Sequence, residues 1–171
     1  MQSNNLPLPY PTIEGPCGVA DARLLADDFA GRDGEMTAIA QYMFQHTVLK
    51  DEYPELAADL EGIALGEMQH YELLADAITR CGGLPYVAGS HCFWSGSAVT
   101  YDTEALDAVR ADIAGEIYAI GAYKRTIQKV KNVSLQNLLR RIIADEQTHL
   151  RLLRQWEARL LRNPEPRETQ E

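Results

Sequence analysis

The chain has 171 residues, of which 46% are hydrophobic and 24% are charged, and its formal net charge is −9 with a sequence pI near 4.9. This length and composition are typical of one globular domain with one substantial core. The acidic charge argues against nucleic acid and anionic membrane surfaces as partners. No run of about 18 apolar residues is present, so we expect no transmembrane helix and no membrane partner.

Two further features predict a cytoplasmic protein. The N-terminal residues lack the basic and apolar regions of a secretory signal. The three cysteines, Cys17, Cys81 and Cys92, form no CxxC pair. Their odd number and scattered spacing favour reduced thiols over a disulfide framework.

In chain order, residues 1–20 are rich in proline, asparagine and glycine, and we expect an extended N-terminal arm. Helical periodicity then predicts a bundle over residues 21–162, followed by a polar tail at 163–171. Its four helices are expected at about residues 21–50, 54–81, 103–131 and 134–162. Pro54 suits a first helical turn, and Gly82 and Gly83 suit the end of the second helix.

The lengths of the connections predict the topology. Short connections make the first and second helices antiparallel neighbours, and likewise the third and fourth. Residues 81–101 lie between the two pairs and show no helical period. Such a segment is long for a compact domain and can pass from one end of a bundle to the other. An all-α four-helix bundle with one such crossover has the ferritin-like topology.

The inward faces of these helices carry polar residues among apolar ones. The fourth helix gives the row Leu135, Leu139, Ile142, Glu146, His149, Leu153, Trp156 and Leu160. The second helix gives the row Leu60, Ile63, Glu67, His70, Leu74 and Ala77. The third helix gives the row Val109, Ile113, Glu116, Ile120, Tyr123, Ile127 and Val130. The first helix gives a less regular face of Leu25, Asp28, Arg32, Glu35, Ile39, Tyr42, His46 and Leu49.

Four inward carboxylates, without a matching set of inward lysines or arginines, would be costly to bury. Two divalent cations would neutralise them, and two imidazoles would complete the ligand set. Glutamate and histidine at positions i and i+3 lie on one helical face. The sequence therefore predicts a dimetal centre with the ligands Glu35, Glu67, His70, Glu116, Glu146 and His149. The alternative is a polar core whose residues hydrogen-bond one another, which leaves the excess of carboxylates unexplained.

An internal repeat supports the metal interpretation. Glu35 precedes Glu67 by 32 residues, and Glu116 precedes Glu146 by 30. Each half therefore contains a glutamate and, one hairpin later, a Glu-x-x-His motif, EMQH in the first half and EQTH in the second. This arrangement is typical of the carboxylate-bridged di-iron and di-manganese bundles.

With these motifs, the sequence resembles the ferritin-like superfamily, and within it the rubrerythrin-like and bacterioferritin-like di-iron proteins. The resemblance covers about residues 21–160 and rests on GEMTAIAQYMFQH, IALGEMQHYELL, IAGEIYAIGAYK and IIADEQTHLRLL. It implies two iron ions, each bound by one histidine, and an antiparallel homodimer. Either Glu67 and Glu146 or Glu35 and Glu116 would bridge the metals.

The chain also departs from these families. Rubrerythrins usually have a further carboxylate one turn before the third-helix ligand, where this chain has Ile113. The cysteine-rich rubredoxin domain of many rubrerythrins is absent from this sequence, and the tail does not resemble the fifth helix of cage-forming ferritins. Manganese catalases share a similar ligand set, so two manganese ions remain an alternative to iron.

Three further residues are candidates for roles beside the metals. The resemblance suggests that Asp145 accepts a hydrogen bond from a ligand histidine across the bundle, His70; a solvated helix charge is the alternative. Tyr42 and Tyr123 each lie seven residues after a predicted ligand. They could donate hydrogen bonds at the site or relay electrons, or they could simply fill the core.

The expected function is that of a di-iron oxidoreductase that reacts with H2O2 or O2, a rubrerythrin-like peroxidase with an unknown electron donor. The alternatives are a ferroxidase or iron-handling protein, a dimanganese catalase, and a bundle that binds metal without catalysis.

Overall fold

The computed structural model describes residues 3–162, which form five α-helices and one short 3-10 helix. The α-helices are α1 (Val19–Ala30), α2 (Glu35–Leu49), α3 (Pro54–Arg80), α4 (Ala105–Lys129) and α5 (Val133–Arg162). The 3-10 helix η1 (Gly96–Ala98) lies in the long connection between α3 and α4. The predicted tail at 163–171 lies outside the described residues.

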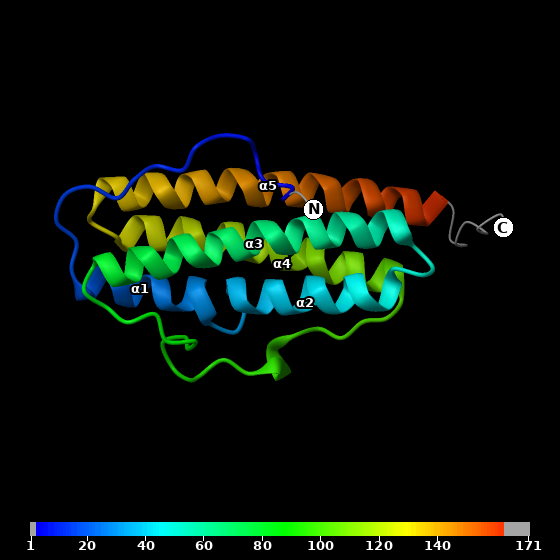
Figure 1. Cartoon of the computed structure of the whole chain (residues 1–171), viewed down its shortest axis with the longest axis horizontal. Helices are drawn as coiled ribbons and strands as arrows, with labels where there is room; N and C mark the ends of the chain where they lie inside the picture. Colours follow the sequence, from blue (N-terminus) through cyan, green and yellow to red (C-terminus); the bar gives the residue numbers. More distant parts are fainter. Residues whose placement is uncertain (1–2, 163–171) are drawn as a thin grey trace.

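These elements form the expected four-helix bundle, in which α1 and α2 together occupy the first of the four positions (Figure 1). The pair α2 and α3 and the pair α4 and α5 are antiparallel neighbours. The connection after α3 runs along the outside of the bundle to the opposite end, where α4 begins (Figure 1). The prediction of two helix pairs and one long crossover is confirmed. None of the helices within residues 3–162 combines the length and the apolarity needed to span a membrane.

The prediction of one continuous first helix was wrong, because the chain breaks between α1 and α2. A side chain at Gly31 or Gly34 would place its Cβ 2.5 or 2.6 Å from the carbonyl oxygen of Asp27. The two glycines therefore permit a close turn of the backbone that other residues would obstruct. The break resets the helical phase, so Arg32 is exposed while Glu35 begins α2 and is buried. The irregular inward face predicted for residues 21–50 has this physical cause.

The apolar core is divided into two clusters along the bundle axis. One cluster contains Leu25, Leu74 and Leu139, and the other contains Leu49, Leu60 and Leu153. Among the buried residues of α5, the first cluster ends at Ile143 and the second begins at Leu153. The polar residues of the sequence motifs therefore occupy a layer near the middle of the bundle, enclosed by apolar packing at both ends.

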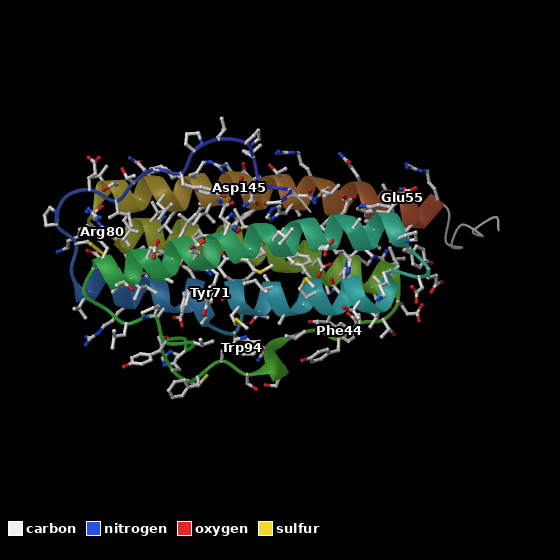
Figure 2. All side chains as sticks on the ribbon, viewed as in Figure 1. Phe44, Glu55, Tyr71, Arg80, Trp94 and Asp145 are labelled. Atoms are coloured by element: carbon white, nitrogen blue, oxygen red, sulfur yellow. A yellow bond between two sulfur atoms is a disulfide. The ribbon has the colours of Figure 1, made fainter. Side chains whose placement is uncertain are left out.

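The crossover is attached to the bundle by specific contacts. Trp94 donates its indole N–H to Thr37 Oγ1 at 2.9 Å, and it lies between the crossover and the bundle (Figure 2). Tyr101 makes an edge contact with Phe44 at 5.0 Å between ring centroids. Phe93, in contrast, is 76% exposed. Of the aromatic residues in this segment, Trp94 and Tyr101 thus fix the crossover against α2.

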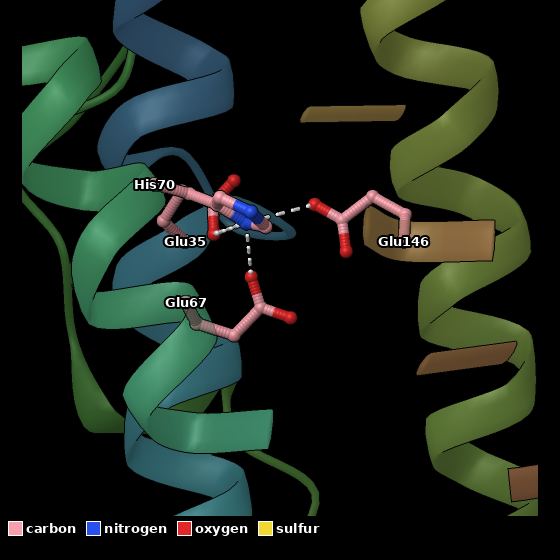
Figure 3. A group of neighbouring side chains, drawn as sticks. All are labelled: Glu35, Glu67, His70 and Glu146. Atoms are coloured by element: carbon pink, nitrogen blue, oxygen red, sulfur yellow. Dashed lines mark hydrogen bonds and ion pairs between the residues drawn. The ribbon is translucent and has the colours of Figure 1, made fainter. Parts of the chain in front are cut away.

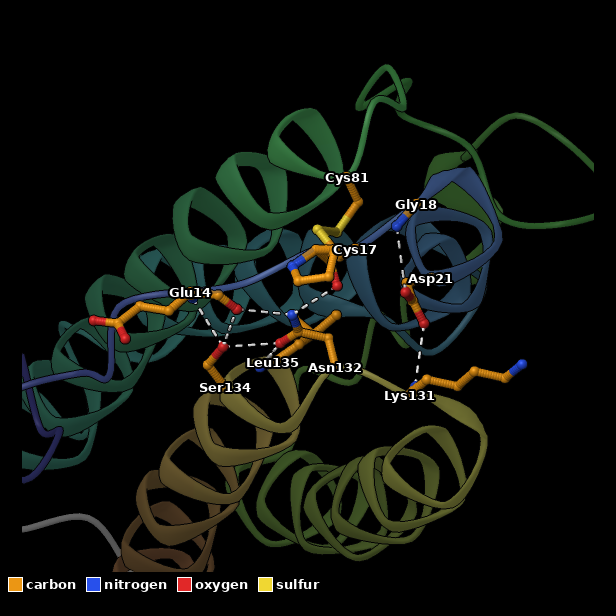
Figure 4. Close-up of a disulfide and its surroundings, with 10 residues drawn as sticks. Glu14, Cys17, Gly18, Asp21, Cys81, Lys131, Asn132, Ser134 and Leu135 are labelled. Carbon is orange, nitrogen blue, oxygen red and sulfur yellow. Dashed lines mark hydrogen bonds between the residues drawn. A yellow bond between two sulfur atoms is a disulfide. The ribbon is translucent and has the colours of Figure 1, made fainter.

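The N-terminal arm returns along α5 and ends in a disulfide between Cys17 and Cys81 at the end of α3 (Figure 4). The expectation of reduced thiols is wrong for this pair, whereas Cys92 is free and exposed. Beside the disulfide, Asn132 donates its side-chain N–H groups to the carbonyls of Glu14 and Pro16 at 2.8 and 3.1 Å. The arm is therefore bound to two helical hairpins before α1 begins.

Replacing Cys17 with serine should lower the free energy of unfolding by roughly 4 kcal/mol, because the disulfide closes a loop of 64 residues in sequence separation. Denaturant unfolding of the variant, and of the unchanged protein with and without reductant, would measure the effect. Cys92→Ser is the matched control and should change stability by less than about 0.5 kcal/mol. Equal stability of reduced and oxidised protein would show that the disulfide does not stabilise the fold.

Candidate metal centre

The six predicted ligands converge in the polar layer between the two apolar clusters. Glu35 lies at the start of α2, Glu67 and His70 lie in α3, Glu116 lies in α4, and α5 provides the last two, Glu146 and His149. All six side chains are buried, and both histidines have no exposed surface. The structure therefore brings together the complete predicted set.

The residues form two groups of four. In the first group, Nδ1 of His70 lies 2.9 Å from Glu67 Oε2, 3.2 Å from Glu146 Oε1 and 3.8 Å from Glu35 Oε2 (Figure 3). In the second group, Nδ1 of His149 lies 3.0 Å from Glu67 Oε1, 3.2 Å from Glu146 Oε2 and 3.8 Å from Glu116 Oε1. In each group the four ligand atoms lie within 4.8 Å of one another.

The geometry distinguishes the two glutamate pairs that the sequence left equivalent. Glu67 and Glu146 belong to both groups, and each directs one carboxylate oxygen to His70 and the other to His149. Glu35 and Glu116 belong to one group each. The arrangement thus suits Glu67 and Glu146 as bridging ligands, with Glu35 and Glu116 as terminal ligands of separate metal positions.

The electrostatics of the layer fit a pair of cations. Within residues 3–162, no lysine or arginine makes an ion pair with these four glutamates. Burial, together with the charge of Glu67, raises the pKa of Glu35 well above its usual range. Burial and the charge of Glu146 raise the pKa of Glu116 in the same way. Without metal the site therefore holds protons where a metal-bound site would hold cations.

The pKa values of His70 and His149 are also determined by burial and by the charges of neighbouring glutamates. Burial disfavours the charged form of His149, but Glu67 and Glu146 outweigh it and raise its pKa to about 9. The pKa of His70 is likewise raised well above its usual range, mainly by Glu146 against the effect of burial. Two imidazoliums would give way to two neutral imidazoles when metal binds at Nδ1. Four oxygen-donating carboxylates and two imidazoles suit iron or manganese, so the residues present fit the group.

Each of the two predicted ligand histidines also has a hydrogen-bond partner at its outer nitrogen, Nε2. Nε2 of His70 lies 3.2 Å from Asp145 Oδ2, the contact suggested by the sequence. Asp145 is buried on the arm-facing side of α5 (Figure 2), where Arg141 Nη1 lies 2.6 Å from its Oδ1. Although burial raises the pKa of Asp145, hydrogen bonds from His70 and Arg141 lower it below its usual range. Nε2 of His149 lies 2.8 Å from Oδ1 of Asn5 in the arm.

The two candidate tyrosines contact the terminal glutamates. Tyr42 donates a hydrogen bond to Glu116 Oε1, and Tyr123 donates one to Glu35 Oε1. Burial and the adjacent glutamate raise the pKa of each phenol well above its usual range. Both phenols are therefore protonated at neutral pH and act as hydrogen-bond donors. The pair is symmetric, because each tyrosine reaches across to the glutamate of the other half.

A cavity of about 410 Å³ leads to this centre from the side of α2, α4 and the crossover. Its lining includes Glu35, Glu67, Glu116 and Glu146 together with Tyr42 and Tyr123. Asp112 also lines the cavity, where its Oδ1 accepts hydrogen bonds from Gln41 at 2.7 Å and Gln45 at 3.0 Å. Its Oδ2 is buried without a hydrogen-bond partner among the described residues. The cavity is large enough for a small oxidant such as a peroxide.

Asp112 should make the metal-free protein less stable as the pH rises. Desolvation raises its pKa from 3.8 to about 7. The folded state therefore binds this proton more tightly than the unfolded state, so stability present below pH 4 is lost as the pH rises through 7. Asp112→Asn removes this loss, which is on the order of a few kcal/mol at about 1.4 kcal/mol per pKa unit.

The measurement is urea unfolding of chelator-treated protein at pH 5 and pH 8. Asp112→Asn should stabilise the protein more at pH 8 than at pH 5. The exposed Asp107→Asn, on the same helix, is the control and should show little difference between the two pH values. An equal effect of Asp112→Asn at both pH values would show that Asp112 does not titrate in this range.

Asn5 and Asp112 were not predicted from the sequence. Asp112 lies four residues before Glu116 and is 1% exposed, and its position one helical turn from a ligand could have indicated it. Asn5 had no such signal, because it lies in a segment without periodicity, and only the path of the arm brings it to His149.

Comparisons with known proteins identify the family of this chain. The family model described as Rubrerythrin matches residues 30–157. A bacterioferritin from Desulfovibrio desulfuricans is 37% identical over 117 residues, which cover 68% of this chain and 64% of that protein. The match therefore spans less than two thirds of that relative's length. A crystal structure of bacterioferritin from the same organism, described with a diiron site, has a TM-score of 0.67 at 30% identity and covers 85% of this chain and 81% of that one.

A manganese catalase from Anabaena, KatB, has the same fold. Its structure gives a TM-score of 0.82 at 20% identity, with coverage of 98% of this chain and 83% of that chain. The family match includes all six residues of the candidate centre. By its sequence, its ferritin-like bundle and its paired carboxylate–histidine groups, this chain belongs to the rubrerythrin family of the ferritin-like superfamily.

Proposed function

We propose that the chain is a di-iron oxidoreductase that reduces H2O2, or O2, with electrons from an external donor. The observation that carries the proposal is the sharing of Glu67 and Glu146 between two equivalent groups, His70 with Glu35 and His149 with Glu116. Two iron ions held there would supply the two electrons that convert one H2O2 and two protons into two waters. Two adjacent metal positions favour two-electron chemistry. The cavity that leads to them favours a reaction over a purely structural role, because a structural metal site needs no access for a substrate.

The residues around the centre would support this reaction in specific ways. Tyr42 and Tyr123 hold the terminal carboxylates by hydrogen bonds and keep their own protons. The apolar clusters on both sides exclude bulk water along the bundle axis. The cavity past Asp112 gives a small oxidant a path to the glutamates. We propose that both tyrosines position the oxidant beside the centre. We also propose that the protein works as a homodimer in the cytoplasm, although the disulfide between Cys17 and Cys81 removes the argument for that location from reduced thiols.

The test begins with elemental analysis of protein purified without added metal. We expect iron, and we expect that consumption of H2O2 requires a reductant and releases no O2. Release of O2 without reductant would instead indicate a dimanganese catalase. Oxidation of added Fe²⁺ beyond two ions per chain, with accumulation of ferric iron, would indicate an iron-handling protein. Metal binding without any of these activities would contradict an enzymatic role.

A further inference from the structure

The arm residue Asn5 occupies a position that the internal repeat leaves empty. The repeat aligns Glu67 with Glu146, and so aligns Gly66 with Asp145. Asp145 reaches across the bundle to the outer nitrogen of His70, and a side chain at position 66 would lie beside the outer nitrogen of His149. Gly66 has no such side chain. A Cβ placed there would lie 3.1 Å from His149 Nε2 and 2.3 Å from Asn5 Oδ1.

The amide of Asn5 has a defined orientation in this space. Its nitrogen faces oxygen acceptors, with Tyr10 Oη at 2.9 Å, Gln69 Oε1 at 3.3 Å and the carbonyl of Gly66 at 3.4 Å. The same nitrogen lies 3.3 Å from His70 Nε2, but that imidazole nitrogen donates its proton to Asp145, so it does not accept a hydrogen bond from Asn5. Its oxygen is consequently the atom that faces His149 Nε2 at 2.8 Å, where it accepts the imidazole proton. Nδ1 of His149, on the opposite side of the ring, then remains directed at Glu67 and Glu146.

The contact belongs to a hydrogen-bond chain between the two ligand histidines. His149 donates to Asn5, Asn5 donates to Tyr10, and Tyr10 donates to Asp145 Oδ2 at 2.7 Å. Asp145 also accepts from His70. The arm is held at this point by the backbone N–H of Leu6, which donates to Asp145 Oδ1 at 2.8 Å. The arm thus provides the outer partner of His149 and holds Asp145, the outer partner of His70.

We propose that Asn5 is a positioning residue that replaces, at His149, the carboxylate which Asp145 provides at His70. Because Asn5 is neutral and Asp145 is charged, the two metal positions differ. A carboxylate partner increases the basicity of a ligand imidazole more than an amide does. The position of His149 and Glu116 therefore binds a divalent metal more weakly than the position of His70 and Glu35. This inference rests on the metal centre of the proposed function but not on its reaction.

The test measures Mn²⁺ binding to the chelator-treated full chain by the EPR signal of the free ion. The unchanged protein should bind two ions with different affinities. Asn5→Ala should weaken the weaker step by about 10–100-fold, the usual effect of losing such a partner, and should leave the tighter step within about threefold. Asn4→Ala is the matched control. Asn4 also attaches the arm to α3, because its backbone and side-chain N–H groups donate to the carbonyls of Gly62 and Asp59, neither of which is a predicted ligand.

Variants that keep only one of the two metal positions show which position Asn5 affects. Glu116→Gln should leave the position of His70, and Glu35→Gln should leave the position of His149. Asn5→Ala should weaken binding in the Glu35→Gln background and have little effect in the Glu116→Gln background. Adding Gly66→Asp to Asn5→Ala should restore the weaker step, because the new carboxylate enters the space that Asn5 leaves.

Three results would overturn the inference. Asn5→Ala could have the same Mn²⁺ affinities as Asn4→Ala, it could weaken Mn²⁺ binding equally at both positions, or it could weaken Mn²⁺ binding only in the Glu116→Gln background. Fewer than two Mn²⁺ per unchanged chain would overturn the dimetal centre and this inference together, whereas the first three results leave the centre intact.

Discussion

Replacing Glu67 and Glu146 together by alanine should remove both metal ions from the protein. Each of these glutamates directs one oxygen to each histidine, so their loss removes two ligands from both positions at once. The buried carboxylate charge also falls by half, which removes much of the attraction for cations. Metal content per chain, measured after purification and again after reconstitution, is the direct readout.

The terminal glutamates provide the contrast to this double variant. Glu35→Gln or Glu116→Gln alone should cost one metal ion, because each residue belongs to one group only. The glutamine keeps the shape of the side chain and can still accept from Tyr123 or Tyr42. If Glu67→Ala with Glu146→Ala kept its full metal content, or if a terminal variant lost both ions while the double variant lost one, the bridging assignment would be wrong.

Removal of metal should lower the stability of the bundle substantially. A ligand that binds only the folded state at a thousand times its Kd adds about 4 kcal/mol, and for a chain of this size each kcal/mol shifts Tm by about 2–4 °C. We therefore expect chelation to lower Tm by about 10 °C or more. Thermal unfolding with and without metal measures this difference. Equal Tm values would contradict binding to the folded state.

The difference in stability between the metal-bound and the metal-free protein should increase with pH. In the metal-free protein the raised pKa values of Glu35 and Glu116 mean that stability is present below their usual pKa and is lost as the pH rises through the raised one. The raised pKa values of His70 and His149 act in the same direction. Glu67 acts oppositely. Although burial raises its pKa, His149 lowers it well below the usual range, and this contribution is lost only as the pH falls through that lowered pKa.

Metal binding has the reverse pH dependence, because the ligands must lose these protons. Raising the pH from 6 to 8 should therefore destabilise the metal-free protein and increase metal affinity. Glu35→Gln with Glu116→Gln should reduce the pH dependence of the metal-free form, since amides do not titrate. A metal-free protein that became more stable from pH 6 to pH 8 would contradict this description of the buried carboxylates.

The sequence could predict the bundle and the six residues because both depend on local pattern. Apolar rows with a 3.6-residue period show which faces are buried, and a glutamate in such a row is conspicuous since it is costly to bury. The repeat of EMQH and EQTH then placed two similar groups opposite each other. The crossover followed from its length and from the absence of helical period.

The remaining features depend on contacts between distant parts of the chain. The break at Gly31 and Gly34 arises from a close backbone approach that periodicity does not encode. The disulfide between Cys17 and Cys81 forms because the arm returns along α5 to the end of α3. Asn5 reaches His149 for the same reason. The choice of Glu67 and Glu146 as the shared pair required the positions of individual carboxylate oxygens.

The most direct test of the dimetal centre is the anomalous scattering of crystals of the metal-loaded protein at the absorption edge of the bound metal. We expect two peaks per chain in the middle of the bundle, one beside His70 Nδ1 and the other beside His149 Nδ1, with Glu67 and Glu146 contacting both. A single peak, or peaks confined to exposed carboxylates on the surface, would contradict it.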